Sequence, residues 1–292
     1  MGDSRKNVVI IGGGGGGVPV FKELEKQLDP ATHRLVLIES RDYYFHLPAA
    51  LRMTVSVMGN LEETALIPYD HLITRPSLSS IYRARALSIT ATEVVTDLEP
   101  VPYEYLVLAT GSTWEGPLNL PPAKVDAVEA VSAQRTQYRS SHSVLIVGGG
   151  AVGIELAGEL RESLPHVKVN LVHRNRALMN DTYPDKYRQS LHDMLIKAGV
   201  NIILNDMIVD ESANAEGMFM TVSGQPIAAD LLIPTRGGRP NTSMLAEFDP
   251  TSLIEETGYV RVEPNLQVKL ISGACNLYAV GDIIDWPEQK AS

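Results

Sequence analysis

A run of six glycines near the start of the chain contains the first residues whose spacing could do chemistry. It comprises Gly12, Gly13, Gly14, Gly15, Gly16 and Gly17. The first, third and sixth match the pattern G-x-G-x-x-G, in which one glycine makes a tight turn, one lets the backbone approach a pyrophosphate and one lets a helix pack closely on a strand. An apolar strand is expected before the run, at 7–11. An amphipathic helix is expected after it, at 18–28, and free N–H groups at its start can hold a diphosphate. The alternative, a flexible linker, is disfavoured by these two neighbours.

Glu39 supplies the acidic residue that such a turn requires. It stands at the C-terminal end of the next expected strand, at 35–38, and 27 residues after Gly12. A carboxylate at this position can accept hydrogen bonds from both hydroxyls of an adenosine ribose. We therefore predict a dinucleotide site here, the alternative being that Glu39 is an ordinary exposed glutamate.

A second copy of the pattern begins 136 residues after the first. Gly148, Gly150 and Gly153 follow an expected strand at 143–147 and precede an expected helix at 154–164. Two such turns, each with a strand before it and a helix after it, are far more specific than one. The sequence therefore predicts two dinucleotide-binding units.

The second turn differs from the first at the residue expected to face the ribose. At the end of its second strand His173 replaces the acid, and Arg174 and Arg176 follow. A carboxylate there would favour NAD and repel a 2′-phosphate, whereas an arginine accommodates that phosphate. The pattern favours NADPH over NADH, although two arginines in a solvated loop would look the same.

Glu155 lies two residues beyond the last glycine of the second turn, in the first turn of the expected helix. We interpret it as the residue that positions a nicotinamide against a flavin. The alternative is a structural glutamate that the helix dipole favours. We assign no acid–base residue, because redox cofactors carry this chemistry themselves, and we predict no metal site.

Three further places have residue types suited to cofactor contacts. Arg52, in an aromatic and helical connection, is expected to pair with a phosphate, or else to form a surface salt bridge. Thr110 and Gly111 follow a buried strand, where glycine lets the backbone approach a ligand. Gly281 and Asp282 end the last expected strand. The carboxylate there can accept a hydrogen bond from the ribityl chain of a flavin, or serve only as a turn residue.

The composition excludes several classes of protein. The 292 residues, 44% of them hydrophobic, are enough for two domains. The net charge is −10 and no block of Lys or Arg exceeds two residues, so nucleic-acid binding has no electrostatic basis. The single cysteine, Cys275, excludes a disulfide framework and the paired redox cysteines of flavin disulfide reductases. Neither a signal peptide nor an apolar run of roughly 18 residues is found, so we expect a reducing, cytoplasmic location.

These elements predict an α/β fold with two Rossmann-like FAD- and NAD(P)-binding domains, each a parallel sheet with helices and a small antiparallel β-meander. The second domain is expected to be inserted into the first. We predict an FAD-binding domain at 1–115 and 245–292, and an NAD(P)H-binding domain at 116–244.

Further elements are expected in the returning part of the chain. Strands are predicted at 258–262 and 266–270, before the last strand that leads to Gly281. Residues 288–292 look like the start of a helix.

Several stretches carry a resemblance to a known family. They are FHLPAALR, LVLATGST, IVGGGAVGIELAGEL, LVHRNRAL, and NLQV followed by NLYAVGD. With the two glycine turns, they resemble flavoprotein oxidoreductases of the pyridine nucleotide-disulfide reductase superfamily. They are most similar to its apoptosis-inducing-factor-like, ferroptosis-suppressor branch, which is related to type II NADH dehydrogenases. The resemblance covers nearly the whole chain.

The resemblance implies an FAD-dependent oxidoreductase that passes a hydride from NADPH or NADH to FAD and electrons on to a quinone or a similar small acceptor. It implies that FAD is held by the first glycine run, Glu39, Arg52 and Asp282, with a backbone contact to the adenine near Tyr82. It implies that NAD(P)H is held by the second turn and by Glu155.

Two features depart from the family pattern. In PTRGG, Arg236 stands where the family usually has a glycine, which is expected to alter the nicotinamide side of the pocket. The C-terminal third domain is expected to be absent. In this family it covers the flavin and contributes to the quinone site and to peripheral contact with a membrane, such as that of the mitochondrion or the lipid droplet.

The competing hypothesis is a truncated, catalytically inactive nucleotide-binding or regulatory protein. A disulfide reductase is disfavoured because it would need a second cysteine.

Overall fold

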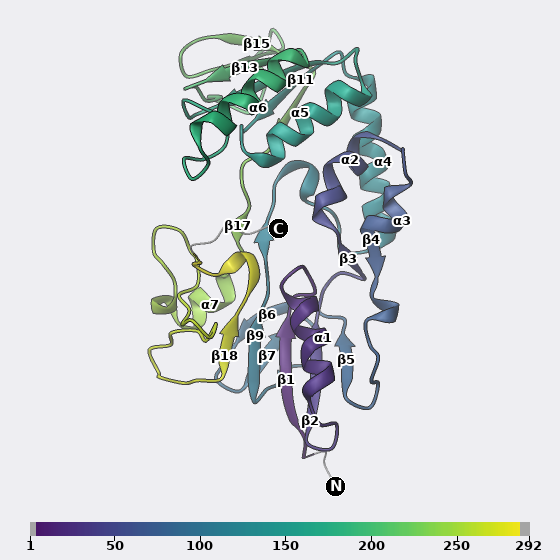
Figure 1. Ribbon diagram of the computed structural model, residues 1–292, viewed down its shortest axis with the longest axis vertical. Coiled ribbons are helices and arrows are strands. Elements are labelled where there is room, and N and C mark those ends of the chain that lie inside the picture. The colour runs from purple at the N-terminus through teal and green to yellow at the C-terminus, as the bar shows by residue number, and fades with distance from the viewer. Residues whose placement is uncertain (1–3, 287–292) are drawn as a thin grey trace.

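Two parallel β-sheets organise the structure, a computed structural model that describes residues 4–286 (Figure 1). The first sheet has the strand order β18-β9-β1-β2-β5. Its strands are β1 (Lys6–Ile11), β2 (His33–Ile38), β5 (Ser79–Tyr82), β9 (Tyr105–Leu108) and β18 (Leu277–Ala279). Side chains of the inner strands are buried on both faces, which explains why these strands read as near-continuous apolar runs.

The second sheet is parallel throughout and has the order β13-β12-β11-β16. Its strands are β11 (Ser143–Val147), β12 (Lys168–His173), β13 (Val200–Leu204) and β16 (Leu231–Pro234). In both sheets the chain first adds strands on one side of the starting strand and then on the other. Such a reversal opens a crevice at the carboxyl ends of the strands, where nucleotides bind in this architecture.

The second sheet is inserted into the first. All of its strands lie in sequence between β9 and β18, which are neighbours in the first sheet. The outgoing segment β10 (Ser112–Thr113) and the returning segment β17 (Arg239–Pro240) pair antiparallel where the chain crosses. Figure 1 shows the second sheet at one end of the molecule and the first at the other. The predicted α/β fold, with one nucleotide-binding unit inside another, is confirmed.

Helices cover the sheets and connect their strands. The longer ones are α1 (Gly17–Gln27), α4 (Lys124–Ser140), α5 (Ala151–Ser163) and α6 (Asp185–Lys197). The shorter ones are α2 (Ala50–Val55), α3 (Leu61–Ala65) and α7 (Ser243–Phe248). Single 3₁₀ turns occur at η1 (Leu47–Ala49), η2 (Tyr69–His71), η3 (Gly116–Leu118), η4 (Pro250–Ser252) and η5 (Gly281–Ile283).

The antiparallel elements differ partly from expectation. The first unit has the predicted meander, formed by β6 (Ala86–Ile89), β7 (Glu93–Thr96) and β8 (Val101–Pro102). The second unit has only the hairpin β14 (Met218–Met220) and β15 (Pro226–Ala228). A further two-stranded pair joins β3 (Tyr43–Phe45) and β4 (Leu66–Pro68).

The strands predicted at 258–262 and 266–270 are wrong. Val260, Val262 and Val268 make only isolated bridges there. Val260 and Val268 are buried in the core of the first unit, so the apolar pattern reflects burial and not a ladder. The chain turns sharply at Leu266, whose φ is +67°, and this interrupts the pairing. The helix expected at 288–292 lies outside the described residues.

The segment 43–66 shares its core with the second unit. Leu51 of α2 and Leu156 of α5 belong to one buried cluster that also includes residues of α4. Beside it, the guanidinium of Arg135 on α4 forms a buried ion pair with Glu62 on α3. The boundary expected at residue 115 therefore separates the strands of the two sheets. It does not separate their cores, because the segment 43–66 packs with the second unit.

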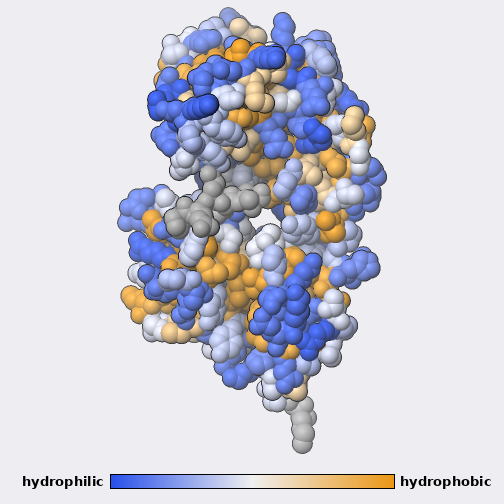
Figure 2. Space-filling model, viewed as in Figure 1, coloured by the Kyte–Doolittle hydropathy of each residue, from blue (hydrophilic) through white to orange (hydrophobic). Residues whose placement is uncertain are grey.

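The surface in view is mainly hydrophilic. On the face shown in Figure 2, apolar residues form separate patches between charged and polar ones. Among residues 4–286, no helix combines the length and the apolar character needed to cross a bilayer.

Candidate dinucleotide-binding sites

The first glycine turn connects β1 to α1 beside the end of β9. Gly12 has a φ of +103° and lies so close to the carbonyl of Ala109 that a Cβ would collide with it. Gly17 lies even closer to the carbonyl oxygen of Gly12, so a Cβ there would also collide. By contrast, a Cβ at Gly14 or Gly15 would meet no atom within 4 Å. The turn is closed toward the strands and open at Gly14 and Gly15, where a diphosphate can approach the backbone.

Glu39 lies against this turn. The N–H of Gly13 donates to one oxygen of its carboxylate, and the N–H of Arg41 donates to the other at 2.8 Å. The second oxygen also accepts from Ser40 Oγ at 3.3 Å, so the first oxygen keeps a lone pair with which a ribose hydroxyl can bond. The hydroxyl of Tyr69, on η2, donates to the carbonyl of Gly13 at 2.7 Å, a contact that the sequence did not predict.

A segment far along the chain, Gly281 and Asp282, reaches the first glycine turn. Gly281, with a φ of +77°, lies against Gly16. Asp282 follows it and accepts a hydrogen bond from Ser112 Oγ at 3.2 Å. Gly281 and Asp282 therefore lie near the start of α1. A cofactor held by the glycine run could contact them there.

Thr110 and Gly111 lie between β9 and the crossing strand β10. The hydroxyl of Thr110 donates to the carbonyl of Asn241 at 2.5 Å, and the N–H of Asn241 donates to the carbonyl of Gly111 at 2.9 Å. Gly111 has a φ of +65°. Thr110 and Gly111 therefore connect the outgoing segment, which leads to β10, with the returning segment after β17 by hydrogen bonds.

Of the two partners expected for Arg52, a phosphate or a surface salt bridge, the structure shows the salt bridge. Its Nε donates to Glu159 of α5 at 2.9 Å, and its Nη2 lies 3.6 Å from Glu162. The cause is the packing of α2 on α5, which brings Arg52 to the acidic side of that helix. Tyr82 ends β5, and its carbonyl accepts the N–H of Glu39 at 3.1 Å, so it lies beside the predicted ribose contact.

The second turn is built in the same way as the first. Gly148 has a φ of +127° and lies against the carbonyl of Thr235, at the end of β16. Gly153 lies against the carbonyl oxygen of Gly148, so that a Cβ would collide with it. The hydroxyl of Thr235 donates to that same carbonyl at 3.0 Å. Gly150, like Gly14, has no atom within 4 Å of a Cβ position.

His173 occupies the place in the second unit that Glu39 occupies in the first. Its Nδ1 accepts the N–H of Gly149 at 3.0 Å, so the proton of the neutral ring is on Nε2. Burial, and then the positive charges of Arg174 and Arg188, lower the pKa of His173. Its Nε2 is buried and has no hydrogen-bond partner in the described part of the chain.

The loop after β12 is anchored by an arginine that the sequence did not single out. Arg188, only 2% exposed, donates to the carbonyl of Leu178 at 2.9 Å and to Asp181 at 2.8 Å. Arg176 is exposed and lies 3.4 Å from Asp185. Arg174 is also exposed, and within residues 4–286 no ion pair is formed by it.

Glu155 stands at the junction of the two units. Partial desolvation of its carboxyl group, and then the charge of Glu159, raise its pKa, although the side chain as a whole is exposed. The nearby Arg52 opposes this shift. The three residues form one charged cluster between α2 and α5.

Arg236, which follows Thr235 after β16, connects two parts of the chain. Its Nε donates to Glu115 at 2.9 Å, and its Nη2 pairs with Glu211. Glu115 belongs to the crossing segment and Glu211 to the loop before β14. The side chain therefore braces the second unit against the crossing.

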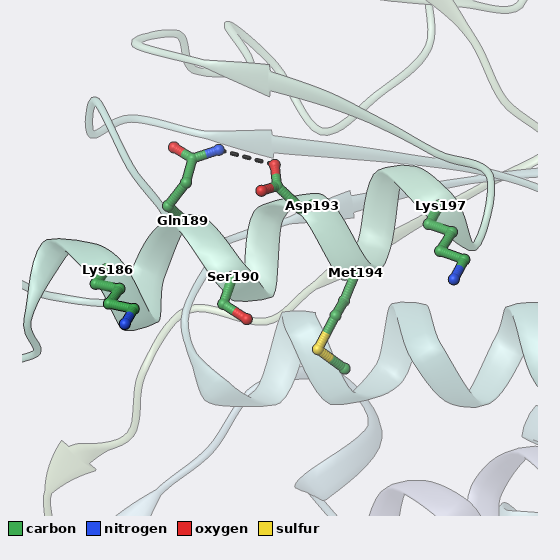
Figure 3. A pocket seen from close by; sticks show the side chains of 6 residues that line it. All are labelled: Lys186, Gln189, Ser190, Asp193, Met194 and Lys197. Carbon is green, nitrogen blue, oxygen red and sulfur yellow. Dashed lines mark hydrogen bonds between the residues drawn. The ribbon is translucent and has the colours of Figure 1, made fainter.

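An open groove of about 440 Å³ runs along α6 and lies outside both turns (Figure 3). Its lining residues are Lys186, Gln189, Ser190, Asp193, Met194 and Lys197. All six project from one helix, with a hydrogen bond between Gln189 and Asp193 at 2.8 Å. None of the six residues belongs to a glycine turn.

Sequence reasoning missed three residues that shape the turns. Thr235 could have been found, because a residue directly after the last strand of a nucleotide sheet borders the switch point. Arg188 gave only a weak signal, an aspartate three residues earlier on the same helix. Tyr69 gave none, because its partner Gly13 is 56 residues away.

Comparisons with known proteins agree with this geometry. A family model described as pyridine nucleotide-disulphide oxidoreductase matches residues 6–291. The FAD-dependent oxidoreductase FVFD30 of Flammulina velutipes is 33% identical over 245 residues, which are 82% of this chain and 74% of that protein. Apoptosis-inducing factor homolog B of Dictyostelium discoideum is 31% identical over 100% of this chain and 78% of its own. Ferroptosis suppressor protein 1 of Homo sapiens is 28% identical over 96% of this chain and 74% of that protein.

Solved structures share the fold. Reduced Bacillus anthracis CoADR-RHD aligns with a TM-score of 0.77 and 19% identity over 96% of this chain, which spans about half of that protein, 51%. NDH2 from Plasmodium falciparum in complex with NADH aligns with a TM-score of 0.72 and 17% identity, over 96% of this chain and 64% of that one.

Proposed function

This chain belongs to the pyridine nucleotide-disulphide oxidoreductase family, and on that premise we propose that it is an FAD-dependent NAD(P)H oxidoreductase. The observation that carries the proposal is the matched construction of the two glycine turns, each at the strand reversal of its own parallel sheet. FAD, when bound, supplies the chemistry by accepting a hydride from a reduced nicotinamide and releasing electrons to an acceptor.

The residues of the two turns fit these cofactors. Gly14 and Gly150 leave open space on the backbone at the start of a helix, where a diphosphate binds. Glu39 offers carboxylate lone pairs for the ribose of FAD, and Asp282, brought to the same turn by Gly281, offers an acceptor for its ribityl chain. Glu155 stands at the junction between the units, where it would orient the nicotinamide.

We assign NADPH as the preferred nucleotide. His173 takes the place of an acid without bringing its negative charge, because its lowered pKa keeps it neutral. Arg174 adds an exposed positive charge on the next residue. The neutral ring of His173 would not repel a 2′-phosphate, and the guanidinium of Arg174 would attract it. A carboxylate in the place of His173 would repel this phosphate.

Two arginine variants test this assignment. Arg174→Ala should reduce the ratio of NADPH to NADH affinity by roughly tenfold, the value of one charge-assisted hydrogen bond. Arg176→Ala is the matched control. Its guanidinium is already paired with Asp185, so it should change the ratio less. An unchanged ratio in Arg174→Ala would contradict the assignment.

We propose a quinone as the electron acceptor, on the strength of the sequence resemblance described above. A substrate disulfide would need a partner cysteine pair, and the sequence has only Cys275. Steady-state reduction of a soluble ubiquinone analogue, compared with reduction of a small disulfide, distinguishes the two. Faster turnover with the disulfide would refute the quinone.

The first experiment is a visible absorbance spectrum of the purified protein, repeated under anaerobic conditions with NADPH and with NADH. A flavin spectrum that bleaches with either nucleotide supports the oxidoreductase. Flavin that binds but does not bleach supports the competing function, a nucleotide-binding protein without turnover. Absence of flavin even after FAD is added would refute the proposed function.

A further inference from the structure

Gly13, the second residue of the first glycine turn, makes hydrogen bonds through both its N–H and its carbonyl. The N–H of Gly13 donates to Glu39, and its carbonyl accepts the hydroxyl of Tyr69 at 2.7 Å. A Cβ at Gly13 would collide with that hydroxyl and crowd Glu39. Tyr69 reaches the turn from η2, and its ring packs in the core cluster that contains β1 and β2.

The equivalent residue of the second turn is held in the same two directions by different groups. The N–H of Gly149 donates to His173 at 3.0 Å, and its carbonyl accepts the backbone N–H of Met179 at 2.8 Å. Met179 makes this bond from a φ of +61°, which costs energy for a residue other than glycine. A phenol in one unit and a strained backbone in the other thus satisfy the same carbonyl, which indicates that the bond matters to the turn.

The geometry of a peptide group shows what the bond does. In a trans peptide the C=O of one residue and the N–H of the next point in opposite directions. When Tyr69 holds the carbonyl of Gly13, it therefore turns the N–H of Gly14 to the opposite side. A Cβ at Gly14 would meet no atom within 4 Å, so a ligand can approach the backbone of Gly14. Without this hydrogen bond the Gly13–Gly14 peptide would be held less firmly, because glycine has no side chain that restricts the backbone.

Tyr69 remains a donor at all ordinary pH values. Burial, and then the negative charge of Glu39, raise the pKa of Tyr69 well above its usual range. The phenol therefore stays protonated beside the carboxylate.

We propose that Tyr69 is a positioning residue of the first nucleotide site, whose hydroxyl fixes the Gly13–Gly14 peptide so that the N–H of Gly14 is presented to a diphosphate. The inference rests on the proposed binding of FAD at this turn. It assigns no catalytic role to Tyr69.

The test is Tyr69→Phe, which keeps the ring and removes the hydroxyl. The dissociation constant of FAD, measured by flavin fluorescence on the apoprotein, should rise roughly tenfold, the equivalent of one hydrogen bond. ADP, titrated by calorimetry, should weaken by a similar factor. Adenosine should bind as it does to the wild type, because it has no diphosphate.

The matched control is Tyr103→Phe. The hydroxyl of Tyr103 also donates to a backbone carbonyl, that of Thr90 at 2.6 Å, but in the meander of the first unit. This variant should leave FAD affinity unchanged. Tyr69→Phe should in turn leave the binding of NADPH at the second turn unchanged.

Three results would overturn the proposal. They are an unchanged FAD affinity in Tyr69→Phe, an equal loss for adenosine and ADP, and an equal loss of NADPH binding, which would make Tyr69 a general stabiliser. A wild-type protein that binds neither FAD nor ADP refutes the proposed function and this inference with it.

Discussion

Alanine at Gly153 should destabilise the second unit, although alanine is the better helix former. A Cβ there would overlap the carbonyl oxygen of Gly148 and press on the hydroxyl of Thr235. Both atoms belong to residues that directly follow a strand of the second sheet, β11 or β16, so α5 has to move. Such overpacking costs about 1–3 kcal/mol, sometimes more, and improved helix propensity returns about 1 kcal/mol. We expect a net loss of up to about 2 kcal/mol and weaker binding of NADPH.

Gly158 provides a control on the same helix. No atom lies within 4 Å of its Cβ position, so Gly158→Ala should stabilise the protein by about 0.5–1 kcal/mol. The two variants should therefore differ by about 2 kcal/mol, or roughly 4–8 °C in thermal midpoint, as followed by circular dichroism. Equal midpoints, or a Gly153→Ala variant more stable than the wild type, would refute the idea that close packing at Gly153 sets this turn.

Two other predictions concern buried charge and pH. Arg135→Met should lower the free energy of unfolding by about 3–5 kcal/mol, because it leaves Glu62 buried without its partner, and adding Glu62→Leu should recover most of the loss in urea denaturation. A smaller loss for the single variant than for the double one would contradict this. His173 has a lowered pKa, so below about pH 6.5 the unfolded chain binds more protons than the folded one. Its contribution to stability is therefore complete above that pH and decreases as pH falls toward the lowered value, when protonation of Nδ1 breaks the bond from Gly149. Unfolding curves at about pH 7.5 and about pH 5.5 should show this decrease, and His173→Gln should reduce it.

The glycine turns were predictable because their physics is local. Strand, turn and helix follow one another within about 20 residues, and the role of each glycine depends on atoms of the same turn or of the next strand. Glu39 and His173 could be located by counting to the end of the following strand. The insertion was predictable because a second complete turn appears before the first sheet has its last strand.

The contacts that depend on tertiary packing were not predictable in this way. Nothing in the sequence near Tyr69 indicates that it reaches Gly13. For Arg52 the sequence left a phosphate and a surface salt bridge open, and only the packing of α2 on α5 shows that the arginine pairs with Glu159. The residues at 258–262 alternate as in a strand, with Val260 buried. Burial alone does not specify a hydrogen-bonded partner strand, and Val260 makes only isolated bridges.

The nesting of one sheet inside the other also determines the order in which the protein can be completed during synthesis. Leu106 of β9 pairs with Leu277 of β18, and the whole second sheet is made between them. While residues 109–276 emerge, one edge of the first sheet remains without its neighbour. The second unit already has all of its strands by Pro234, together with the earlier segment 43–66 that shares its core. The nascent chain can therefore complete the unit it began second before the one it began first, and it carries an open strand edge, the kind of edge through which chains associate wrongly, until β18 arrives.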